Sequence, residues 1–421
     1  MVVDEENKLN LADIVICLIV SFMLMAIYLF ELESWGRYVI FGCALLVALI
    51  YSFHRNYVFP IIFESFHSYV LAFAIFCFLS SVWAWNSSLA LSKGITILVA
   101  LVTLSLIYPY YRENNIDLLL KSFMLSGYGI SAYTIFYYGL SSIVSMLSGG
   151  VRMGNDFSNA NSIGLVATVS CIIQMYFWLK KERNVLIVFL IPTIICIAIS
   201  QSRKAIVMLL VGIAATIITS GDKTKRSKRF LKIIVGITVL FLMLYLVQHL
   251  EIFSGVSNRF TILFESINGE RAEDIRSIYR RIGMQQFFKT PVFGIGMGNS
   301  LELLASVGQR RTYLHCNFVE LLASGGVIGF VIYYLIYVYL LTNLWKYRKI
   351  DSSRTMLCFV LLVLMLVMDY GMVSYYDKQQ YMYFMCFFIH VEHLKKKSFG
   401  KIEKNLNKFE NRGRKSIGKE V

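Results

Sequence analysis

Long apolar blocks with few charged residues follow one another along almost the whole chain, and they limit the folds that it can adopt. A helix needs about 20 apolar residues to cross the roughly 30 Å of hydrocarbon in a bilayer, and roughly twelve blocks reach that length. Hydrophobic residues make up 57% of the 421 positions and charged residues only 16%, which excludes a soluble domain of this size. The sequence therefore predicts an all-α polytopic membrane protein, a single integral membrane domain over residues 1–421. We expect helices to begin near Leu11, Arg37, Phe66, Leu91, Leu118, Asn159, Asn184, Lys204, Phe230, Tyr313, Thr355 and Lys378.

The most basic short segments between the blocks indicate which side of the membrane they occupy. They are "KKER" from Lys180, "GDKTKRSKR" from Gly221, "KYRKIDSSR" from Lys346 and a basic tail over 393–421. Because Lys and Arg concentrate in cytoplasmic loops, we expect these segments and both termini in the cytoplasm. The acidic start "MVVDEENKLN" leads straight into the first block, so we expect no cleaved signal peptide. The net charge of +15 fits this anchoring pattern better than nucleic-acid binding.

One connection, over residues 249–312, is too long and too polar for an ordinary link between spans, and it falls on the extracytoplasmic side. Within it, apolar residues recur at helical spacing over 275–287, which predicts short helices. The run "GIGMGN" from Gly294 resembles a nucleotide-binding loop, but the sequence around it lacks the strand and helix that such a loop joins. The glycines that follow Pro291 instead predict a tight turn.

Arginines collect on the face where the topology rule disfavours them. Arg152 and Arg203 stand just before predicted spans, and the connection over 249–312 contributes others, among them Arg276, Arg280, Arg310 and Arg311. Guanidinium groups near helix N-termini suit a phosphate or pyrophosphate. At the outer membrane surface, a pyrophosphate on a polyprenyl tail is the leaving group of a lipid-linked sugar donor. Fixed arginines could stabilise the charge that develops on it without a metal.

His315 stands at the outer end of the tenth predicted span. A neutral imidazole there could take the proton from an incoming sugar hydroxyl, although a histidine at a helix end is more often a structural interface residue. Glu320 and Asp369, within or near spans, are candidates either for function or for structural hydrogen bonds. His390 and His393 lie at the cytoplasmic end of the last span, where we expect surface positions. The eight scattered cysteines predict packing residues rather than a disulfide or zinc framework.

Several segments, in this order along the chain, resemble one known family. They are "NANSIG" from Asn159, "SQSRKA" around Arg203, "RSIYRRIGMQQFFKTPVFGIGMGNS" from Arg276 and "HCNFVELLASGGVIGF" from His315. Their pattern is similar to the signature region of the O-antigen ligase and Wzy-type polysaccharide polymerase family. In that region an Arg is followed by an aromatic residue, a Pro-x-x-Gly-x-Gly turn, and a His that opens a helix ending in Gly-x-x-Gly. The match covers roughly the second half of the chain, and the first five helices match only in hydropathy.

Two positions depart from the common pattern of the family. Tyr279 stands where Trp is frequent, and Lys204 stands where a small residue is usual. Neither change removes a group that the expected chemistry needs.

The resemblance implies roles for individual residues. Arg203 and Arg276 would hold undecaprenyl pyrophosphate, with Arg280 one helical turn on as a substitute, and His315 would activate the acceptor hydroxyl. Further candidates for substrate binding are Arg152, Asn159, Arg310, Arg311 and Glu320. The fold would be of the membrane glycosyltransferase C type, and the family implies no metal and no other cofactor.

The resemblance also implies a function. The chain would be a polysaccharide polymerase that joins undecaprenyl-pyrophosphate-linked repeat units at the outer face of the bacterial cytoplasmic membrane, for O-antigen, capsule or exopolysaccharide. Its partners would be the lipid-linked donor and acceptor, membrane lipid, a chain-length regulator and a flippase, with no nucleic acid. A ligase that moves the finished chain onto lipid A core or another acceptor carries the same motifs. A flippase or exporter of the same lipid-linked sugars is the alternative from another class, and it would show internal repeats and charges in both halves.

Overall fold

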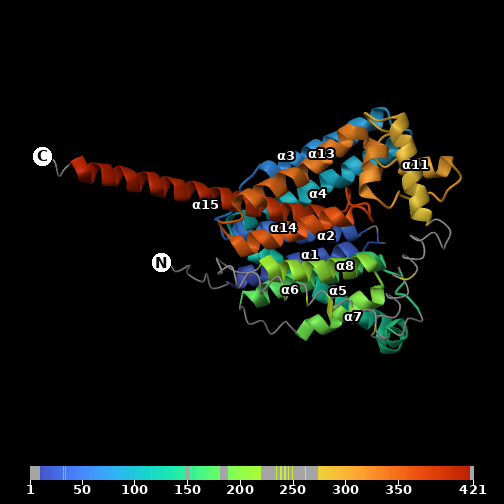
Figure 1. The fold of residues 1–421 in the computed structure, drawn as a ribbon, viewed down its shortest axis with the longest axis horizontal. Coiled ribbons are helices and arrows are strands. Elements are labelled where there is room, and N and C mark those ends of the chain that lie inside the picture. Colours follow the sequence, from blue (N-terminus) through green and yellow to red (C-terminus); the bar gives the residue numbers. More distant parts are fainter. Residues whose placement is uncertain are drawn as a thin grey trace.

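In a computed structural model the chain folds into a bundle of long helices that run roughly along one axis (Figure 1). The structure describes residues 10–31, 33, 35–114, 116–147, 151–154, 156–180, 188–219 and 274–417, and isolated positions between 234 and 261. The side chains of 401–417 fall outside this description. Within the described ranges the regular elements are all helices, as the sequence predicts.

Seven helices in the described part of the chain are long and apolar enough to cross a membrane, so the chain is a polytopic membrane protein. The α-helices are α1 (Leu11–Leu29), α2 (Gly36–Phe53), α3 (Ser65–Leu79), α4 (Ser87–Glu113), α5 (Asp117–Leu147), α6 (Ala160–Leu179), α7 (Leu190–Ser200), α8 (Arg203–Thr219), α11 (Ile275–Lys289), α12 (Ser300–Ser306), α13 (Asn317–Tyr347), α14 (Ser352–Met368) and α15 (Lys378–Ile417). Of these, α7 and α14 are shorter apolar helices. The helix expected from Phe230 lies largely outside the described residues, so the total of about twelve spans stays a prediction.

The helices α14 and α15 occupy the middle of the bundle. Helix α14 packs against α8 and α13, and the first part of α15 packs against α3, α4 and α13. Residues 379–391 of α15 are buried over their whole length. The core around them is rich in tyrosine and phenylalanine, among them the fully buried Tyr333, Tyr337 and Phe384.

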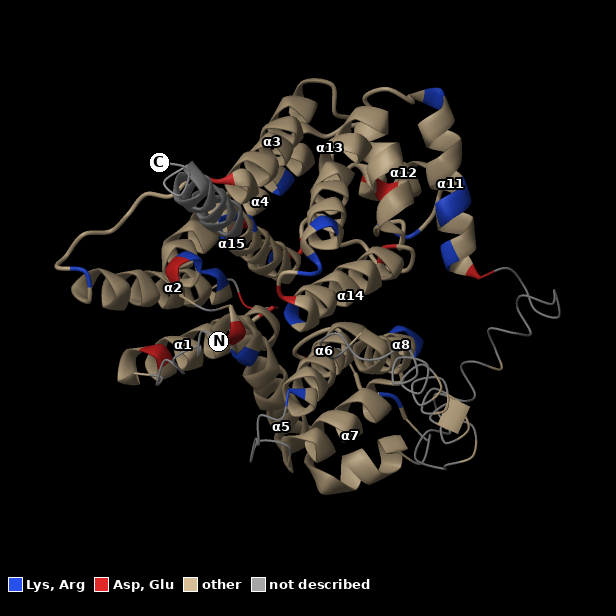
Figure 2. Ribbon diagram, turned by 60° about the vertical axis from the view of Figure 1, so that its left-hand side comes forward, with Lys and Arg blue, Asp and Glu red and all other residues tan. Residues whose placement is uncertain are grey.

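The directions of the helices give the bundle two distinct ends. Chain segments at one end include the end of α1, the start of α6, the start of α13 and the start of α15. The opposite end carries the basic connections at Lys180 and Lys346, and there Asp117 forms ion pairs with Arg354 at 2.7 Å and with Lys180 at 3.5 Å. Figure 2 shows lysines and arginines near several helix ends and along α11.

Local backbone conformation sets where two of these helices begin. Asn159 caps α6, and its side chain accepts a hydrogen bond from the backbone N–H of Asn161 at 2.9 Å. Helix α13 begins at Asn317 rather than at the expected Tyr313, because His315 adopts a left-handed backbone with φ of 57°. A helix cannot continue through that conformation. His315 therefore lies in the turn that leads into α13.

The glycine run after Pro291 forms the tight turn that the sequence predicts. Gly294, Gly296 and Gly298 all have positive φ, and a Cβ atom at Gly296 would lie 2.3 Å from the Cβ of Ala84. The indole of Trp83 donates a hydrogen bond to the carbonyl of Phe293 at 3.1 Å. The turn thus packs closely against the connection between α3 and α4, and it holds α11 and α12 on the end of the bundle.

Candidate functional site

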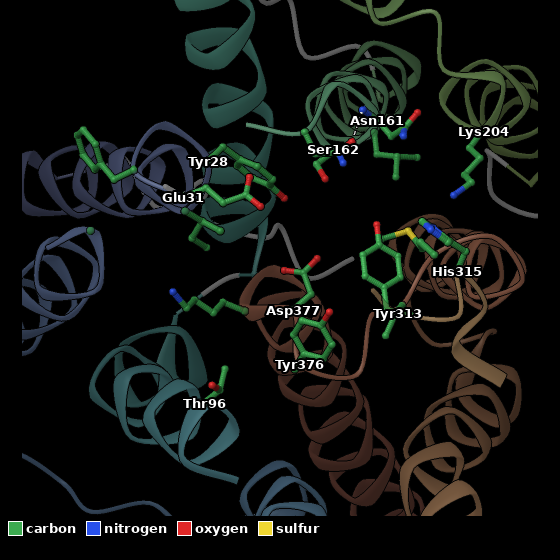
Figure 3. A pocket seen from close by; sticks show the side chains of 18 of the residues that line it. Tyr28, Glu31, Thr96, Asn161, Ser162, Lys204, Tyr313, His315, Tyr376 and Asp377 are labelled. Carbon is green, nitrogen blue, oxygen red and sulfur yellow. Dashed lines mark hydrogen bonds between the residues drawn. The ribbon is translucent and has the colours of Figure 1, made fainter. Parts of the chain in front are cut away.

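A cavity of about 720 Å³ opens at the end of the bundle where α6 and α13 begin. Its lining comes from α1, α2, α4, α6, α8 and α11, from the segment that precedes α13, and from the segment that joins α14 to α15. Figure 3 shows its side chains converging from opposite sides, with Lys204 and His315 on one side and Glu31 on the other.

Three cations from different parts of the chain form what we call the cationic wall: Arg152, Lys204 and Arg276. The guanidinium of Arg152 is held by hydrogen bonds to the carbonyl of Ser200 and to the side chain of Asn161, both at 2.9 Å. The ammonium of Lys204 donates to the carbonyl of Gly371. Arg276 lies in the first turn of α11, where positive helix-end charge adds to its own. The wall is therefore pre-positioned for an anion.

His315 lies next to the cationic wall and is held between aromatic rings. Its imidazole is stacked on Tyr279, with centroids 6.0 Å apart and planes 12° apart, and it is tilted against Tyr313 at 4.3 Å. Burial, followed by the charges of Arg276 and Lys204, lowers the pKa of His315 to about 4. The imidazole is therefore neutral at pH 7 and able to accept a proton.

Carboxylates face the cavity from the other side, and we call Glu31, Glu33 and Asp377 the acidic wall. The carboxylate of Glu31 accepts a hydrogen bond from the hydroxyl of Ser158 at 2.6 Å. Burial, with the nearby charge of Glu31, raises the pKa of Asp377 to about 6, although a hydrogen bond from the backbone N–H of Gln379 opposes the rise. Among the described residues, no group of three or more His, Cys, Asp or Glu side chains is placed to hold a metal ion.

The structure brings four of the predicted site residues together on this cavity: Arg152, Asn159, Arg276 and His315. Asn159 contributes as the cap of α6, whose N-terminus faces the cavity. The remaining predicted residues are absent from the cavity's lining: Arg203, Arg280, Arg310, Arg311 and Glu320. Arg203 is adjacent to Lys204, whose ammonium experiences the positive charge of both Arg203 and Arg276.

Each of the other predicted residues outside the lining has a different environment. Arg280 donates to the hydroxyl of Ser277 at 2.9 Å and lies over the ring of Tyr370. Arg310 is exposed, and Arg311 forms an ion pair with Glu302.

Glu320 and Asp369 have structural hydrogen bonds. The fully buried carboxylate of Glu320 accepts hydrogen bonds from the hydroxyl of Ser300 and from the backbone N–H of Leu314, at 3.0 Å for the latter. The carboxylate of Asp369 accepts from Asn317, Tyr334, Tyr337 and Ser374. Both carboxylates thus fix the segments that carry His315 and Asp377.

The expected surface position of His390 is wrong. Its side chain is only 2% exposed and lies 2.9 Å from the hydroxyl of Thr355. The reason is that α15 passes through the middle of the bundle, so its polar residues are enclosed by neighbouring helices. His393, one turn further, is partly buried and lies 2.7 Å from the carbonyl of Arg112.

Sequence reasoning did not single out the acidic wall, Lys204 as a cavity residue, or Tyr313. A usable signal was present for the carboxylates, because Glu31 follows the first apolar block directly and Asp377 precedes the last. Charged groups at the same end of successive spans meet when those spans pack together.

Comparison with known proteins places part of this site in a family. A family model described as O-antigen ligase matches residues 187–334. No curated protein and no solved structure matches the chain. The matched segment includes Lys204, Arg276 and His315, whereas Glu31 and Asp377 lie outside it. Residues 187–334 are therefore similar to the O-antigen ligase family, which is the family that the arginine, glycine and histidine motifs of this chain resemble.

Proposed function

We propose that this chain is a membrane glycosyltransferase that joins undecaprenyl-pyrophosphate-linked oligosaccharide repeats into a polysaccharide of the O-antigen, capsule or exopolysaccharide kind. The observation that carries this proposal is one cavity in which a cationic wall lies beside a neutral imidazole. The family match supports the broader statement of an O-antigen ligase or polymerase type of activity.

The cationic wall holds the pyrophosphate of the donor. Arg152, Lys204 and Arg276 supply positive charge from separate elements, and the N-termini of α6, α8 and α11 point their partial positive charge toward the same region. Arg203, beside Lys204, adds charge to this wall, and Arg280 lies one turn beyond Arg276. Cations fixed before the reaction stabilise the negative charge that develops as the sugar leaves the pyrophosphate.

His315 serves as the base in a single displacement. The acceptor hydroxyl attacks the anomeric carbon of the donor sugar, the bond from that carbon to the pyrophosphate oxygen breaks, and the hydroxyl proton passes to the imidazole. Neutrality of His315 at pH 7 supports this role. The positive charge of the wall supplies the electrostatic stabilisation that a divalent metal supplies in other enzymes, so the reaction is metal-independent. Inversion at the anomeric carbon follows from one displacement.

The site faces the outside of the bacterial cytoplasmic membrane, and both termini face the cytoplasm. Basic connections at the opposite end of the bundle from the cavity support this orientation, because such connections favour the cytoplasmic side. The lipid tail of the donor then remains in the bilayer while its pyrophosphate reaches the cavity. We further propose that the fold is of the membrane glycosyltransferase C type. A chain-length regulator and a flippase are the proposed protein partners.

A ligase that transfers the finished chain to lipid A core or another acceptor is the second candidate, and the description of the matching family favours it. Both activities need the same donor chemistry, so the cationic wall and His315 serve either one. A flippase of lipid-linked sugars remains the alternative from another class, but a cavity at one end of the bundle suits transfer chemistry at one membrane face better than transport.

The lipid-linked species that accumulate in a deletion strain separate these functions. A polymerase leaves single repeats on the outer side, a ligase leaves long chains on undecaprenyl pyrophosphate, and a flippase leaves single repeats on the inner side. Purified protein with lipid-linked repeats and no divalent metal should produce a ladder of products on a gel. Activity abolished by a chelator would contradict the metal-independent mechanism.

A further inference from the structure

The cavity has two walls of opposite charge, and the mechanism above uses only one of them. The acidic wall carries Glu31, just after the end of α1, and Asp377, just before α15. Arg37 and Lys378 also line the cavity, and the charge of Lys378 acts on Asp377. Charges of both signs on one surface suit neutral hydroxyl groups better than they suit an ion.

A mostly buried tyrosine on this wall has a hydroxyl that is available to a ligand. Tyr28 is only 6% exposed, it lines the cavity beside Glu31, and its hydroxyl has no hydrogen-bond partner among the described residues. Its oxygen experiences the charges of both Asp377 and Glu31. Figure 3 shows the Tyr28 hydroxyl directed toward the space in front of these carboxylates. A hydroxyl that no protein group binds, on a mostly buried side chain that faces a cavity, is available to donate to a ligand there.

We propose that Tyr28, Glu31 and Asp377 bind the acceptor sugar through its hydroxyl groups and present it to the donor held on the cationic wall. This inference rests on the proposed function and names the acceptor subsite of the same cavity. Carboxylate oxygens accept hydrogen bonds from adjacent sugar hydroxyls, and the tyrosine hydroxyl supplies a donor. The rings of Tyr28 and Tyr376 add apolar surface for the face of a sugar ring.

The donor pyrophosphate is excluded from this wall because carboxylates repel it. Tyr313 marks the boundary: its hydroxyl experiences the positive charge of Arg276 and the negative charge of Glu31. Figure 3 shows Tyr313 between His315 and Asp377. A sugar bound on the acidic wall therefore has the base and the donor on one side of it.

The family match divides the cavity in the same way. Lys204, Arg276 and His315 lie within residues 187–334, while Tyr28, Glu31 and Asp377 lie outside that segment. Most of the donor chemistry thus comes from the part of the chain that the family model describes, with Arg152 of the cationic wall as the exception. Recognition of the acceptor comes from parts outside it, so the acidic wall sets which sugar accepts the chain.

Two probes test this division on the purified full chain in detergent. One is the repeat-unit oligosaccharide released from its lipid by mild acid, which keeps the acceptor hydroxyls but lacks pyrophosphate. The other is inorganic pyrophosphate, which lacks sugar. Asp377→Asn and Glu31→Gln should each weaken oligosaccharide binding by about tenfold or more, and Tyr28→Phe by less, because only hydrogen bonds to charged groups are that strong. None of the three should weaken pyrophosphate binding.

Matched controls separate a local effect from misfolding. Asp156→Asn changes an acid at the same end of the bundle that lies outside the cavity's lining, and it should leave both binding constants unchanged. Arg276→Ala should weaken pyrophosphate binding and leave oligosaccharide binding intact. Size-exclusion profiles of all variants should match the unmodified protein.

The outcomes distinguish this inference from the proposed function. If Asp377→Asn and Glu31→Gln bind the oligosaccharide as the unmodified protein does, or if the unmodified protein does not bind it, the acceptor subsite is overturned. Transfer activity of the unmodified protein would still uphold the proposed function in that case. If the oligosaccharide binds through the acidic wall but no sugar is transferred from lipid-linked repeats, the proposed function fails and the subsite stands as a carbohydrate-binding site.

Discussion

The imidazole of His315 lies against the ring of Tyr279 in a nearly parallel stack, with the centroids 6.0 Å apart. The two residues belong to different elements, since Tyr279 is in α11 and His315 is in the turn before α13. Tyr279 is only 4% exposed and packs with Leu314 and Cys316, so its ring is fixed by its neighbours. The stack therefore fixes the imidazole relative to α11. It also helps to hold His315 in its left-handed backbone conformation.

Replacing Tyr279 should test whether this stack positions the base. Tyr279→Leu should lower kcat by about three- to tenfold with little change in KM for the donor, since an aromatic pair contributes about 0.5–1.5 kcal/mol beyond its buried area. Tyr279→Phe should keep nearly full activity because it preserves the stacked ring. Equal activity of the Leu and Phe variants would show that the ring does not act on His315.

The low pKa of His315 predicts an unusual dependence of kcat on pH. Burial is the largest cause that lowers this pKa to about 4. The charges of Arg276, Lys204 and Arg280 act in the same direction, and Asp274 opposes the shift. A base works in its neutral form, which persists above the pKa and is lost as the pH falls through it. At saturating acceptor, kcat should therefore show no step near pH 6.5 and should fall only near pH 4.

A single substitution near His315 should shift the pH at which kcat falls. Lys204→Met removes one of the cations that face the imidazole, so the pKa of His315 should rise and the acid limb of kcat should shift to higher pH. The matched substitution Lys349→Met lies at the opposite end of the bundle and should leave the profile unchanged. A step near pH 6.5 in the unmodified protein would contradict the lowered pKa of His315.

Much of the fold follows from the sequence because span length and span order are local properties. Apolar blocks predict α1 to α6 to within a few residues, and the glycines after Pro291 predict their turn. His390 was misplaced because the enclosure of α15 depends on which helices surround it, and block lengths do not contain that information. The family model that matches residues 187–334 describes the same family that the motifs resemble.

Part of the candidate site also follows from the sequence. Arg276 and His315 were singled out by their motifs, and the structure places both on the cavity. The acidic wall was not anticipated, because Glu31 and Asp377 are far apart in sequence and each looks like an ordinary charge at a span end. The motif assigns the binding role to Arg203 and none to Lys204, because the sequence alone does not tell which of two adjacent cations lines the cavity.

Cysteine labelling should decide which end of the bundle faces the outside. All eight native cysteines are buried, so background labelling should be low. In intact cells Arg310→Cys should react with an impermeant maleimide, whereas Lys349→Cys should react only after permeabilisation. The reverse pattern would place the cavity at the cytoplasmic side and would contradict a periplasmic or extracellular active site.

The arginines of the connection between α8 and α13 should differ sharply in their effect on catalysis. Arg276→Ala should lower product formation by about two to three orders of magnitude, because loss of one fixed charge contact to a leaving group costs roughly 3–4 kcal/mol. Arg276→Lys should recover part of it, since a point charge cannot reproduce the planar fork. Arg311→Ala is the matched control: its ion pair with Glu302 is exposed, such pairs contribute about 0–1 kcal/mol, and activity should change by no more than about twofold. Full activity of Arg276→Ala would remove this residue from the donor site.

Asn317 should be among the most sensitive positions for stability, because it joins the start of α13 to the segment that carries the acidic wall. Its side-chain carbonyl accepts hydrogen bonds from the backbone N–H groups of Ser374 and Tyr375 at 3.0 and 3.2 Å, and its amide donates to Tyr334 and Asp369. Asn317→Ala leaves the buried backbone N–H groups of Ser374 and Tyr375 without this acceptor, at a cost of about 1–3 kcal/mol for each unsatisfied donor.

The unfolding temperature of Asn317→Ala in detergent should therefore fall by several degrees. Asn343→Ala, near the other end of the same helix, removes only a hydrogen bond to the carbonyl of Tyr339 in the preceding turn and should have a much smaller effect. If both variants unfold at the same temperature, the contacts of Asn317 do not hold the two segments together. Asn317→Ala should also be tested for oligosaccharide binding at temperatures where it is still folded. A loss of binding there, together with a lower unfolding temperature, would show that Asn317 positions the segment from Gly371 to Asp377 at the cavity.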